Sequence, residues 1–364
     1  MEQIKGVNLG NWLVLEKWMS SELFYNLPED VEDEMAFYEE LSQEEAENRL
    51  FMHRSYYIQE RDFQHIKKLG LNLVRIPVPY FIFGDCGQGV GCIEFLDKAF
   101  DWAEKYGLKI LIDLHTAPDS QNGFDNGGLS GVIKWHKKPE NIEFELSVIE
   151  RLAKRYAGRK ALYGIELLNE PVSAELLEML NGRYKARHPE QAEGSEPIPL
   201  ELLKEFYVEG YNRVRKYCDE DVAVVLHDNF NLELWDEFMP KDTYENVVID
   251  THMYLFMLEQ QMQDKAIKNY EEMIAKDFGA RLARAQKYHP VIVGEWCIAN
   301  KSNEVRNAET EEEKAPFYRQ IGKWELEAWK NCSGWIFWNY KLHTAGRNDW
   351  DYARAIDGEW LVQE

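Results

Sequence analysis

Basic residues are few for a chain of this size, and this deficit narrows the possible functions. The 364 residues include 42 Lys and Arg against 65 Asp and Glu, for a formal net charge of −23. No block of Lys and Arg appears, which argues strongly against a nucleic-acid partner. Much of the acid lies in residues 28–50. We interpret this segment as a solvated helical face rather than a surface for a cationic partner.

Cysteine is also scarce, and sequence signals for export or membrane insertion are missing. The five cysteines include no CxxC pair and are odd in number, which fits reduced thiols and a cytoplasmic protein. The first residues, MEQIKGVNLG, lack the basic head and apolar core of a secretory signal, although a chain trimmed of its leader would look similar. No apolar run approaches membrane-spanning length, so we expect no membrane partner.

Motifs that bind metals or phosphates are absent as well. The chain has no HExxH and no Cys/His cluster at ligand spacing. The GQGVG segment at 87–91 lacks the Lys and the preceding strand of a phosphate loop. We therefore expect no catalytic metal and no cofactor.

Aromatic residues, by contrast, are abundant. The chain is 45% apolar and 13% aromatic, with 12 Trp and 19 Tyr. This content is enough for a large core, and most of these rings are expected to serve it. Aromatic faces also stack on the C–H faces of sugar rings, so a carbohydrate ligand is an early hypothesis.

Short apolar runs recur along the chain, with helical patterns between them. Segments 95–107 and 200–218 carry apolar residues at the spacing of three and four that is typical of a helix, and Gly107 closes the first. The expected strands are 3–10, 72–78, 109–115, 162–170, 222–228, 246–254, 290–296 and 334–340.

Eight strands alternating with helices predict an α/β protein with a single (β/α)8 TIM barrel. Several runs are almost continuously apolar, as expected of parallel strands covered on both faces. We interpret segment 184–199 as a surface excursion after the fourth strand, so the loops after the strands are elaborated. All of residues 1–364 are predicted to form one catalytic domain.

Polar side chains gather where the predicted strands end. In such barrels the carboxyl ends of the strands form the active site, so these side chains are expected to share one pocket. Taken singly, each also has a structural explanation, such as a buried ion pair or core packing. Their joint occurrence favours a site. They are Arg75, His115, Asn169, Glu170, His227, Asp228, His252, Tyr254, Glu295 and Trp338.

Two of these residues, Glu170 and Glu295, are suited to cleave a glycosidic bond. One carboxyl must be protonated to assist the departing oxygen, and the other must be ionised to attack the anomeric carbon. Mutual repulsion raises the pKa of one carboxyl, while Arg75 is placed to hold the other ionised. Esterification of the nucleophile then removes a charge, so that the acid becomes the base that activates water.

Seven segments together resemble glycoside hydrolase family 5, with the closest likeness to the branch that contains the fungal exo-β-1,3-glucanases. They are, in chain order, GVNLGNWLVLEKW, LVRIP, DLHTAPDSQNGFDNGG, GIELLNEP, HDNF, GEW and GWIFW. The resemblance runs from about residue 5 to about residue 340. It implies a retaining mechanism that acts on β-glucosidic bonds.

The resemblance also implies a role for each site residue. Glu170 would be the acid/base and Glu295 the nucleophile, to which Arg75 and Tyr254 would donate hydrogen bonds. The resemblance further implies Asn169 at the sugar 2-hydroxyl, His115 and His252 lining the cleavage subsite, Trp338 as its floor, Glu16, Asp125 and Asn126 at outer hydroxyls, and Phe124 at the second sugar. This pattern closes the pocket and favours release of one terminal unit.

The chain departs from the family pattern on the leaving-group side. Phe124 matches one member of an aromatic clamp for the second sugar, but the other member falls at Met257, with Phe256 one position off. Expected substrates are therefore β-linked glucosides, oligosaccharides or plant glycosides.

Three alternatives to an exo-acting β-glucosidase remain open. A diglycosidase would release an intact disaccharide from a plant glycoside. An endo-β-glucanase would need the loops at 84–92 and 119–131 to leave the cleft open. A non-catalytic glycan-binding protein is the third alternative, against which the presence of both glutamates argues.

Overall fold

The eight strands pair in chain order and close into a parallel barrel, in which β1 pairs with both β2 and β8. The computed structural model describes residues 3–87, 89–180, 182–346 and 348–362. The predicted (β/α)8 barrel is confirmed. The strands are β1 (Ile4–Asn8), β2 (Leu73–Val78), β3 (Lys109–Leu114), β4 (Leu162–Glu166), β5 (Ala223–His227), β6 (Val247–His252), β7 (Val291–Glu295) and β8 (Gly334–Phe337).

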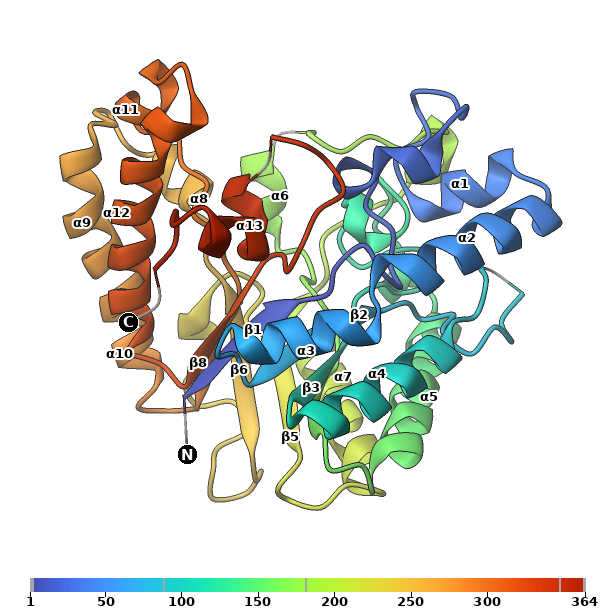
Figure 1. Ribbon diagram of the computed structural model, residues 1–364. Helices are drawn as coiled ribbons and strands as arrows, with labels where there is room; N and C mark the ends of the chain where they lie inside the picture. The colour runs from blue at the N-terminus through green and yellow to red at the C-terminus, as the bar shows by residue number, and fades with distance from the viewer. Residues whose placement is uncertain (1–2, 88, 181, 347, 363–364) are drawn as a thin grey trace.

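Helices cover the outside of this barrel (Figure 1). Within the described ranges, every helix is too short or too polar to cross a lipid bilayer. A π-helical stretch at 274–279 joins α9 to α10. The helices are α1 (Glu34–Glu40), α2 (Gln43–Tyr57), α3 (Glu60–Lys68), α4 (Ile93–Tyr106), α5 (Pro139–Tyr156), α6 (Ala174–Leu180), α7 (Leu200–Arg215), α8 (Leu255–Glu259), α9 (Tyr270–Met273), α10 (Ala280–Ala285), α11 (Asn303–Asn307), α12 (Glu311–Trp329) and α13 (Tyr352–Asp357).

Several strands end earlier than the apolar runs predicted. The fourth run extends to Glu170, but β4 ends at Glu166. The chain beyond β4 bends and makes isolated contacts: the Leu167 amide donates to Val225 O at 3.1 Å, and the Asn169 amide to Leu114 O at 2.9 Å. The apolar run continues past β4 because the residues that follow it are also buried, although the regular strand pairing has ended.

The acidic segment 28–50 forms α1 and the first half of α2, and the excursion at 184–199 packs against it. Arg187 contacts Asp30 at 3.2 Å and Glu39 at 3.3 Å, and also pairs with Glu40. The excursion contains a single 3-10 turn at 189–192 among its described residues. Part of the acidic surface is therefore used within the chain.

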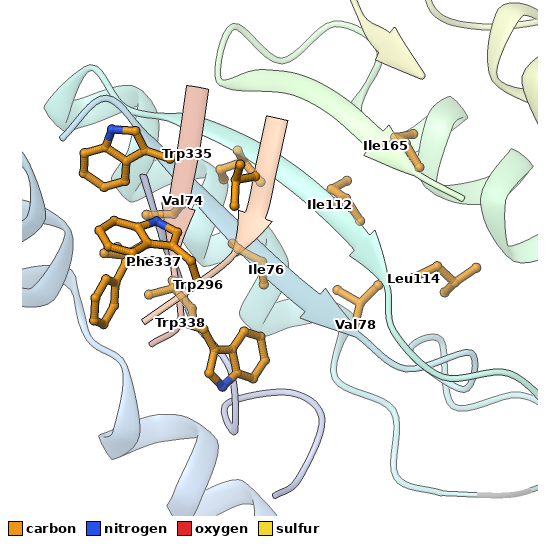
Figure 2. Packing of buried hydrophobic residues seen from close by; sticks show 14 of the residues in the cluster. Val74, Ile76, Val78, Ile112, Leu114, Ile165, Trp296, Trp335, Phe337 and Trp338 are labelled. Carbon is orange, nitrogen blue, oxygen red and sulfur yellow. The ribbon is translucent and has the colours of Figure 1, made fainter. Parts of the chain in front are cut away.

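Side chains alternate between the two sides of the barrel wall. Val74, Ile76 and Val78 of β2 belong to the large outer cluster between strands and helices (Figure 2). Leu73 belongs instead to the small cluster that fills the barrel interior, and Arg75, two residues further on, is wholly buried. An apolar interior layer thus gives way to a charged layer toward the carboxyl ends of the strands.

Candidate active site

The two predicted catalytic carboxylates lie at the carboxyl end of the barrel and are buried. Glu170 follows β4 and is 6% exposed, while Glu295 is the last residue of β7 and is 3% exposed. Glu170 has a positive φ of 45°, a conformation that is rare for a residue with a side chain. Gln121 holds this turn, because its amide group donates to Asn169 O at 2.9 Å.

Each carboxylate has its own hydrogen-bond partners. Glu170 Oε1 lies 2.7 Å from His252 Nδ1, and its Oε2 accepts from Asn126 Nδ2 at 3.1 Å. Glu295 Oε1 accepts from Arg75 Nη1 at 3.0 Å, and its Oε2 accepts from the Tyr254 hydroxyl at 2.7 Å. The contacts that Arg75 and Tyr254 were expected to make with Glu295 are therefore present.

His252 bridges the two carboxylates. Its Nδ1 lies 2.7 Å from Glu170 Oε1 and 3.4 Å from Glu295 Oε2. The two oxygens are therefore no more than about 6 Å apart, which is shorter than the roughly 6.5–9.5 Å between carboxyl groups that admits a water molecule in inverting glycosidases. The pair fits the closer spacing of retaining enzymes.

Arg75 connects the nucleophile side of the site to its surroundings. Its Nη2 donates to Asn169 Oδ1 at 2.8 Å, and its Nη1 donates to Asn8 Oδ1 at 3.0 Å. The Asn8 amide group in turn donates to Gly294 O at 2.8 Å. Sequence reasoning missed Asn8. Its place at the end of the first strand was a signal that could have found it, because the other site candidates were also polar residues at strand ends.

His115 and Trp338 line one wall together. Their rings stack with centroids 5.8 Å apart and an interplanar angle of 8°. His115 Nδ1 contacts Asp113 Oδ2 at 2.5 Å, which orients the ring. Gly10 lies against the indole, and a Cβ there would stand 2.7 Å from Trp338. The NLG motif therefore needs glycine because the ring approaches the backbone.

Glu16 and Asp125 lie at the other end of the pocket. Glu16 Oε2 accepts from the Trp18 indole at 2.8 Å, and Trp18 packs edge-to-face on Trp350 at 5.5 Å. Burial raises the pKa of Glu16 well above its usual value, and the charge of Asp125 adds to this. Neither tryptophan was singled out from the sequence.

The opposite side of the pocket is mostly apolar. Phe124 stacks on Tyr184 with centroids 5.0 Å apart, and Leu176 and Met257 belong to the same cluster. The cavity between these walls measures about 600 Å³ and is lined by both predicted catalytic glutamates. Tyr184 comes from the excursion after β4, so sequence spacing gave no signal for it.

A larger cavity of about 810 Å³ lies next to this pocket, with glycines 127 and 128 in its wall. Its lining includes Tyr38, Tyr80 and Asp119 but neither predicted catalytic glutamate. The smaller cavity is therefore the candidate active site, because it alone contains the paired carboxylates.

The pKa shifts of the two carboxyls do not follow the expectation that repulsion raises the pKa of the acid while Arg75 keeps the nucleophile ionised. Burial raises the pKa of Glu170, but hydrogen bonds from His252 and Asn126 outweigh burial, so its pKa lies below the usual value. Burial raises the pKa of Glu295, and the proximity of Glu170 raises it further. Burial lowers the pKa of His252, yet the neighbouring carboxylates, Glu295 first, raise it well above its usual value. These directions favour the protonated form of His252 beside an ionised Glu170.

Two groupings in this region have ligand atoms within 4.8 Å of one another. One contains Glu170, His227 and His252, and the other contains Glu166, Asp250 and His252. Both groupings already contain or adjoin a positive charge. The raised pKa of His252 favours its protonated form, and the Arg75 guanidinium lies against Glu166 and Asp250. These residues serve as ion-pair partners and fit a metal ion poorly.

Two further strand-end candidates do not face the pocket as substrate ligands. Asp228 accepts the Thr251 hydroxyl at 2.7 Å and the Phe230 amide at 2.8 Å. His227 Nδ1 accepts the Asn229 amide at 3.1 Å, and its ring packs edge-on against His252. Both residues position the backbone at the end of β5.

Known proteins resemble this chain in sequence and in fold. A family model described as Cellulase (glycosyl hydrolase family 5) matches residues 38–343. A glucan 1,3-beta-glucosidase from Schwanniomyces occidentalis is 33% identical, over 97% of this chain and 86% of its own length. A probable glucan 1,3-beta-glucosidase A from Emericella nidulans is 34% identical, over 96% of this chain and 87% of its own.

A solved structure extends this likeness to the whole barrel. The rutinosidase from Aspergillus niger has a TM-score of 0.79 at 22% identity, and the match covers 98% of this chain and 97% of that one. At this identity the likeness shows a shared fold alone.

Proposed function

The chain belongs to glycosyl hydrolase family 5 and is a glycoside hydrolase, and on that premise we propose that it is a retaining, exo-acting β-glucosidase. The observation that carries the proposal is the placement of Glu170 and Glu295, both buried, within 2.7 and 3.4 Å of the same His252 nitrogen. The resulting separation of at most about 6 Å lies below the range of inverting glycosidases and supports Glu295 as a nucleophile rather than as a base that activates water.

The reaction proceeds by two displacements. Glu295 attacks the anomeric carbon while Glu170 gives a proton to the departing oxygen, so an ester bond forms as the glycosidic bond breaks. Water then attacks the same carbon and gives a proton to Glu170, and the ester breaks. Two inversions restore the original β configuration.

The pKa shifts in the site support a route for the first proton. His252 carries the proton and lies 2.7 Å from Glu170 Oε1. When a leaving oxygen approaches Glu170, the proton passes from His252 through the carboxyl to that oxygen. Arg75 and Tyr254 stabilise the ionised form of Glu295 through their hydrogen bonds.

The shape of the pocket supports cleavage from the non-reducing end. Glu16, Asp125 and Asn126 line the pocket and offer hydrogen-bond partners for sugar hydroxyls, and Trp338 offers a stacking face. Relatives named glucan 1,3-beta-glucosidases support β-1,3-linked glucose as one substrate.

The apolar side of the pocket receives the leaving group. Phe124, Tyr184 and Met257 offer van der Waals contact there, and the face of the Phe124–Tyr184 pair is suited to a flat or apolar group. β-Glucosides with an aryl leaving group are therefore included among the proposed substrates.

Substitution of the two carboxylates tests the mechanism. Glu295→Gln should abolish turnover on all substrates. Glu170→Ala should lose roughly 10²- to 10⁴-fold on an unactivated disaccharide, because proton donation is lost. The same variant should spare an aryl glucoside whose leaving group needs no proton, and azide should restore its rate while forming a β-glucosyl azide. Wild-type activity of Glu170→Ala on the disaccharide would contradict the assignment.

Product analysis tests the substrate class. We expect free glucose, formed first as the β anomer, from β-1,3-linked disaccharides and aryl β-glucosides. Release of an intact disaccharide from a plant diglycoside, with no cleavage of monoglucosides, would instead identify a diglycosidase. Internal cleavage of a long β-glucan would identify an endo-acting enzyme, and an α product by NMR would exclude retention.

A further inference from the structure

Beneath the catalytic pair lies a layer of acidic side chains that the reaction does not use directly. Arg75 Nε donates to Glu166 Oε2 at 2.8 Å and lies 3.7 Å from Asp250 Oδ2, while its Nη1 lies 3.1 Å from Asp113 Oδ2. The same Nη1 holds Glu295 at 3.0 Å. The Arg75 guanidinium therefore contacts the proposed nucleophile, Glu295, and three further carboxyl groups.

Among the described residues, three oxygens in this layer have no hydrogen-bond partner: Asp113 Oδ1, Glu166 Oε1 and Asp250 Oδ2. Glu166 and Asp250 are both wholly buried. An oxygen from each of these two carboxyl groups and a ring nitrogen of His252 lie within 4.8 Å of one another. A buried polar atom without a hydrogen-bond partner destabilises the fold. A proton between these two carboxyls would give both oxygens a partner.

The other oxygen of Asp250 is already committed. Asp250 Oδ1 accepts the Gly294 amide at 2.7 Å, next to Glu295 in the sequence. A Cβ at Gly294 would overlap the Asp250 carboxyl, which explains the glycine in the GEW motif. The free oxygen of Asp250, Oδ2, lies 3.7 Å from Arg75 Nε and 3.8 Å from His252 Nε2. Two basic groups near this oxygen favour the ionised form of Asp250, which leaves Glu166 to carry the proton.

Charge balance leads to the same conclusion. Arg75 and His252 are the cations of this buried region, and the carboxyl groups around them are those of Asp113, Glu166, Glu170, Asp250 and Glu295. The phenol of Tyr207 from α7 also faces Glu166, and it donates to the His227 backbone carbonyl. If all five carboxyls were ionised, the buried excess of negative charge would be large.

We propose that Glu166 is a positioning residue that stays protonated and donates its Oε1 hydroxyl to Asp250 Oδ2. Through Oε2 it still accepts the hydrogen bond from Arg75 Nε, so the guanidinium keeps its orientation. Because Glu166 is neutral, less of the Arg75 charge is compensated from below, and more of it acts on Glu295. Burial, followed by the charges of Asp250 and Asp113, raises the pKa of Glu166 well above its usual value, against the opposing effect of Arg75.

The pH profile of kcat/KM on an aryl β-glucoside tests this inference, which rests on the proposed function. Its acidic limb reports ionisation of Glu295 in the free enzyme. Glu166→Gln mimics the neutral acid, so the variant should keep kcat/KM within about threefold and leave the limb in place. If Glu166 were ionised, the amide would remove a negative charge and lower the pKa of Glu295. The limb would then move about one unit or more to lower pH, which would overturn the proposal.

Two variants separate positioning from packing. Glu166→Ala leaves Arg75 Nε without its acceptor, so kcat should fall at least tenfold while KM changes little. Glu145→Ala is the matched control, because Glu145 is equally buried but lies on α5. It should have the kinetics and pH profile of the wild type. An equal loss in both variants would assign Glu166 a purely structural role.

Infrared spectroscopy gives a readout that does not depend on activity. Spectra of protein labelled with ¹³C-glutamate are compared as a difference between the wild type and Glu166→Gln, so that the bands of other buried glutamates such as Glu16 and Glu145, whose pKa burial also raises, cancel. A protonated carboxyl band that belongs to Glu166 should be present in the wild type at pH 7 and absent from the variant. Asp250→Asn supplies a permanent amide donor toward Glu166, so the band should also disappear there while Glu166 is present. Absence of the band from the wild type would overturn the proposal, whereas wild-type turnover of the aryl glucoside separately tests the proposed function.

Discussion

At the scale of single residues, the behaviour of each buried carboxyl depends on groups from other strands. Glu170 and Glu295 differ in pKa direction because His252 Nδ1 lies 2.7 Å from one and 3.4 Å from the other. For Asp228, which directly follows β5, burial raises the pKa to about 7, and no cation lies in contact with it among the described residues. Local sequence around these three acids does not encode the difference.

Asp228 makes stability depend on pH. The folded protein holds this proton up to about pH 7, whereas the unfolded chain releases it near the usual value of 3.8. The contribution of Asp228 to the free energy of unfolding is therefore present at low pH and is lost as the pH rises toward 7, by about 1.4 kcal/mol per unit at most. Asp228→Asn cannot ionise, so its stability relative to the wild type should increase between pH 5 and pH 8.

Urea unfolding at both pH values measures this effect. Asp219→Asn, at an exposed position, is the control and should follow the wild-type pH dependence. Parallel stability curves for Asp228→Asn and the wild type would mean that Asp228 ionises freely in the folded protein.

At the scale of the element, the helix end at Gly107 was predicted correctly, whereas the helix expected to end at 218 ends at Arg215 and the strand expected to end at 170 ends at Glu166. The helix expected at 95–107 is α4, and Gly107 caps it with a φ of 67°. A helix end has a chemical signature in the sequence, namely a residue that tolerates the left-handed conformation. A strand end in a buried barrel has none, which is why Glu170 was expected inside β4.

The cap at Gly107 predicts a stability change that depends on backbone conformation alone. Gly107→Ala places a side chain at positive φ and should lower the free energy of unfolding by about 1 kcal/mol. Gly158→Ala is the matched control, since a Cβ at either glycine meets no atom within 4 Å and only Gly107 has a positive φ. The control should change stability by less than about 0.5 kcal/mol. Equal urea midpoints for the two variants would contradict the conformational explanation.

At the scale of the whole molecule, the excess of acid is distributed over a surface where cations link separate elements. Arg213 of α7 contacts Glu143 and Glu150 of α5, and Arg187 ties the excursion after β4 to α1. These contacts offset part of the repulsion expected from a net charge of −23. The repulsion that these ion pairs do not offset acts over the whole surface, and salt weakens it.

Salt should therefore stabilise the protein at alkaline pH. Raising NaCl from about 20 to about 200 mM shortens the screening length, so the urea midpoint at pH 8 should increase. Near the isoelectric point, which is about 4.9 from the sequence, the same change should have little effect. A fall in the midpoint at pH 8 would show that the ion pairs outweigh the net repulsion.

The sequence by itself determined the barrel, because alternating apolar runs and helical patterns record burial on each element. It also placed Arg75 within the second strand and Glu170 and Glu295 where the fourth and seventh apolar runs end, since these positions follow from chain order. Only the tertiary structure decided how these groups share protons, and it alone introduced Asn8 and Tyr184 to the site. The physical reason is that pKa values and hydrogen bonds depend on distances between strands, and closure of the barrel sets those distances.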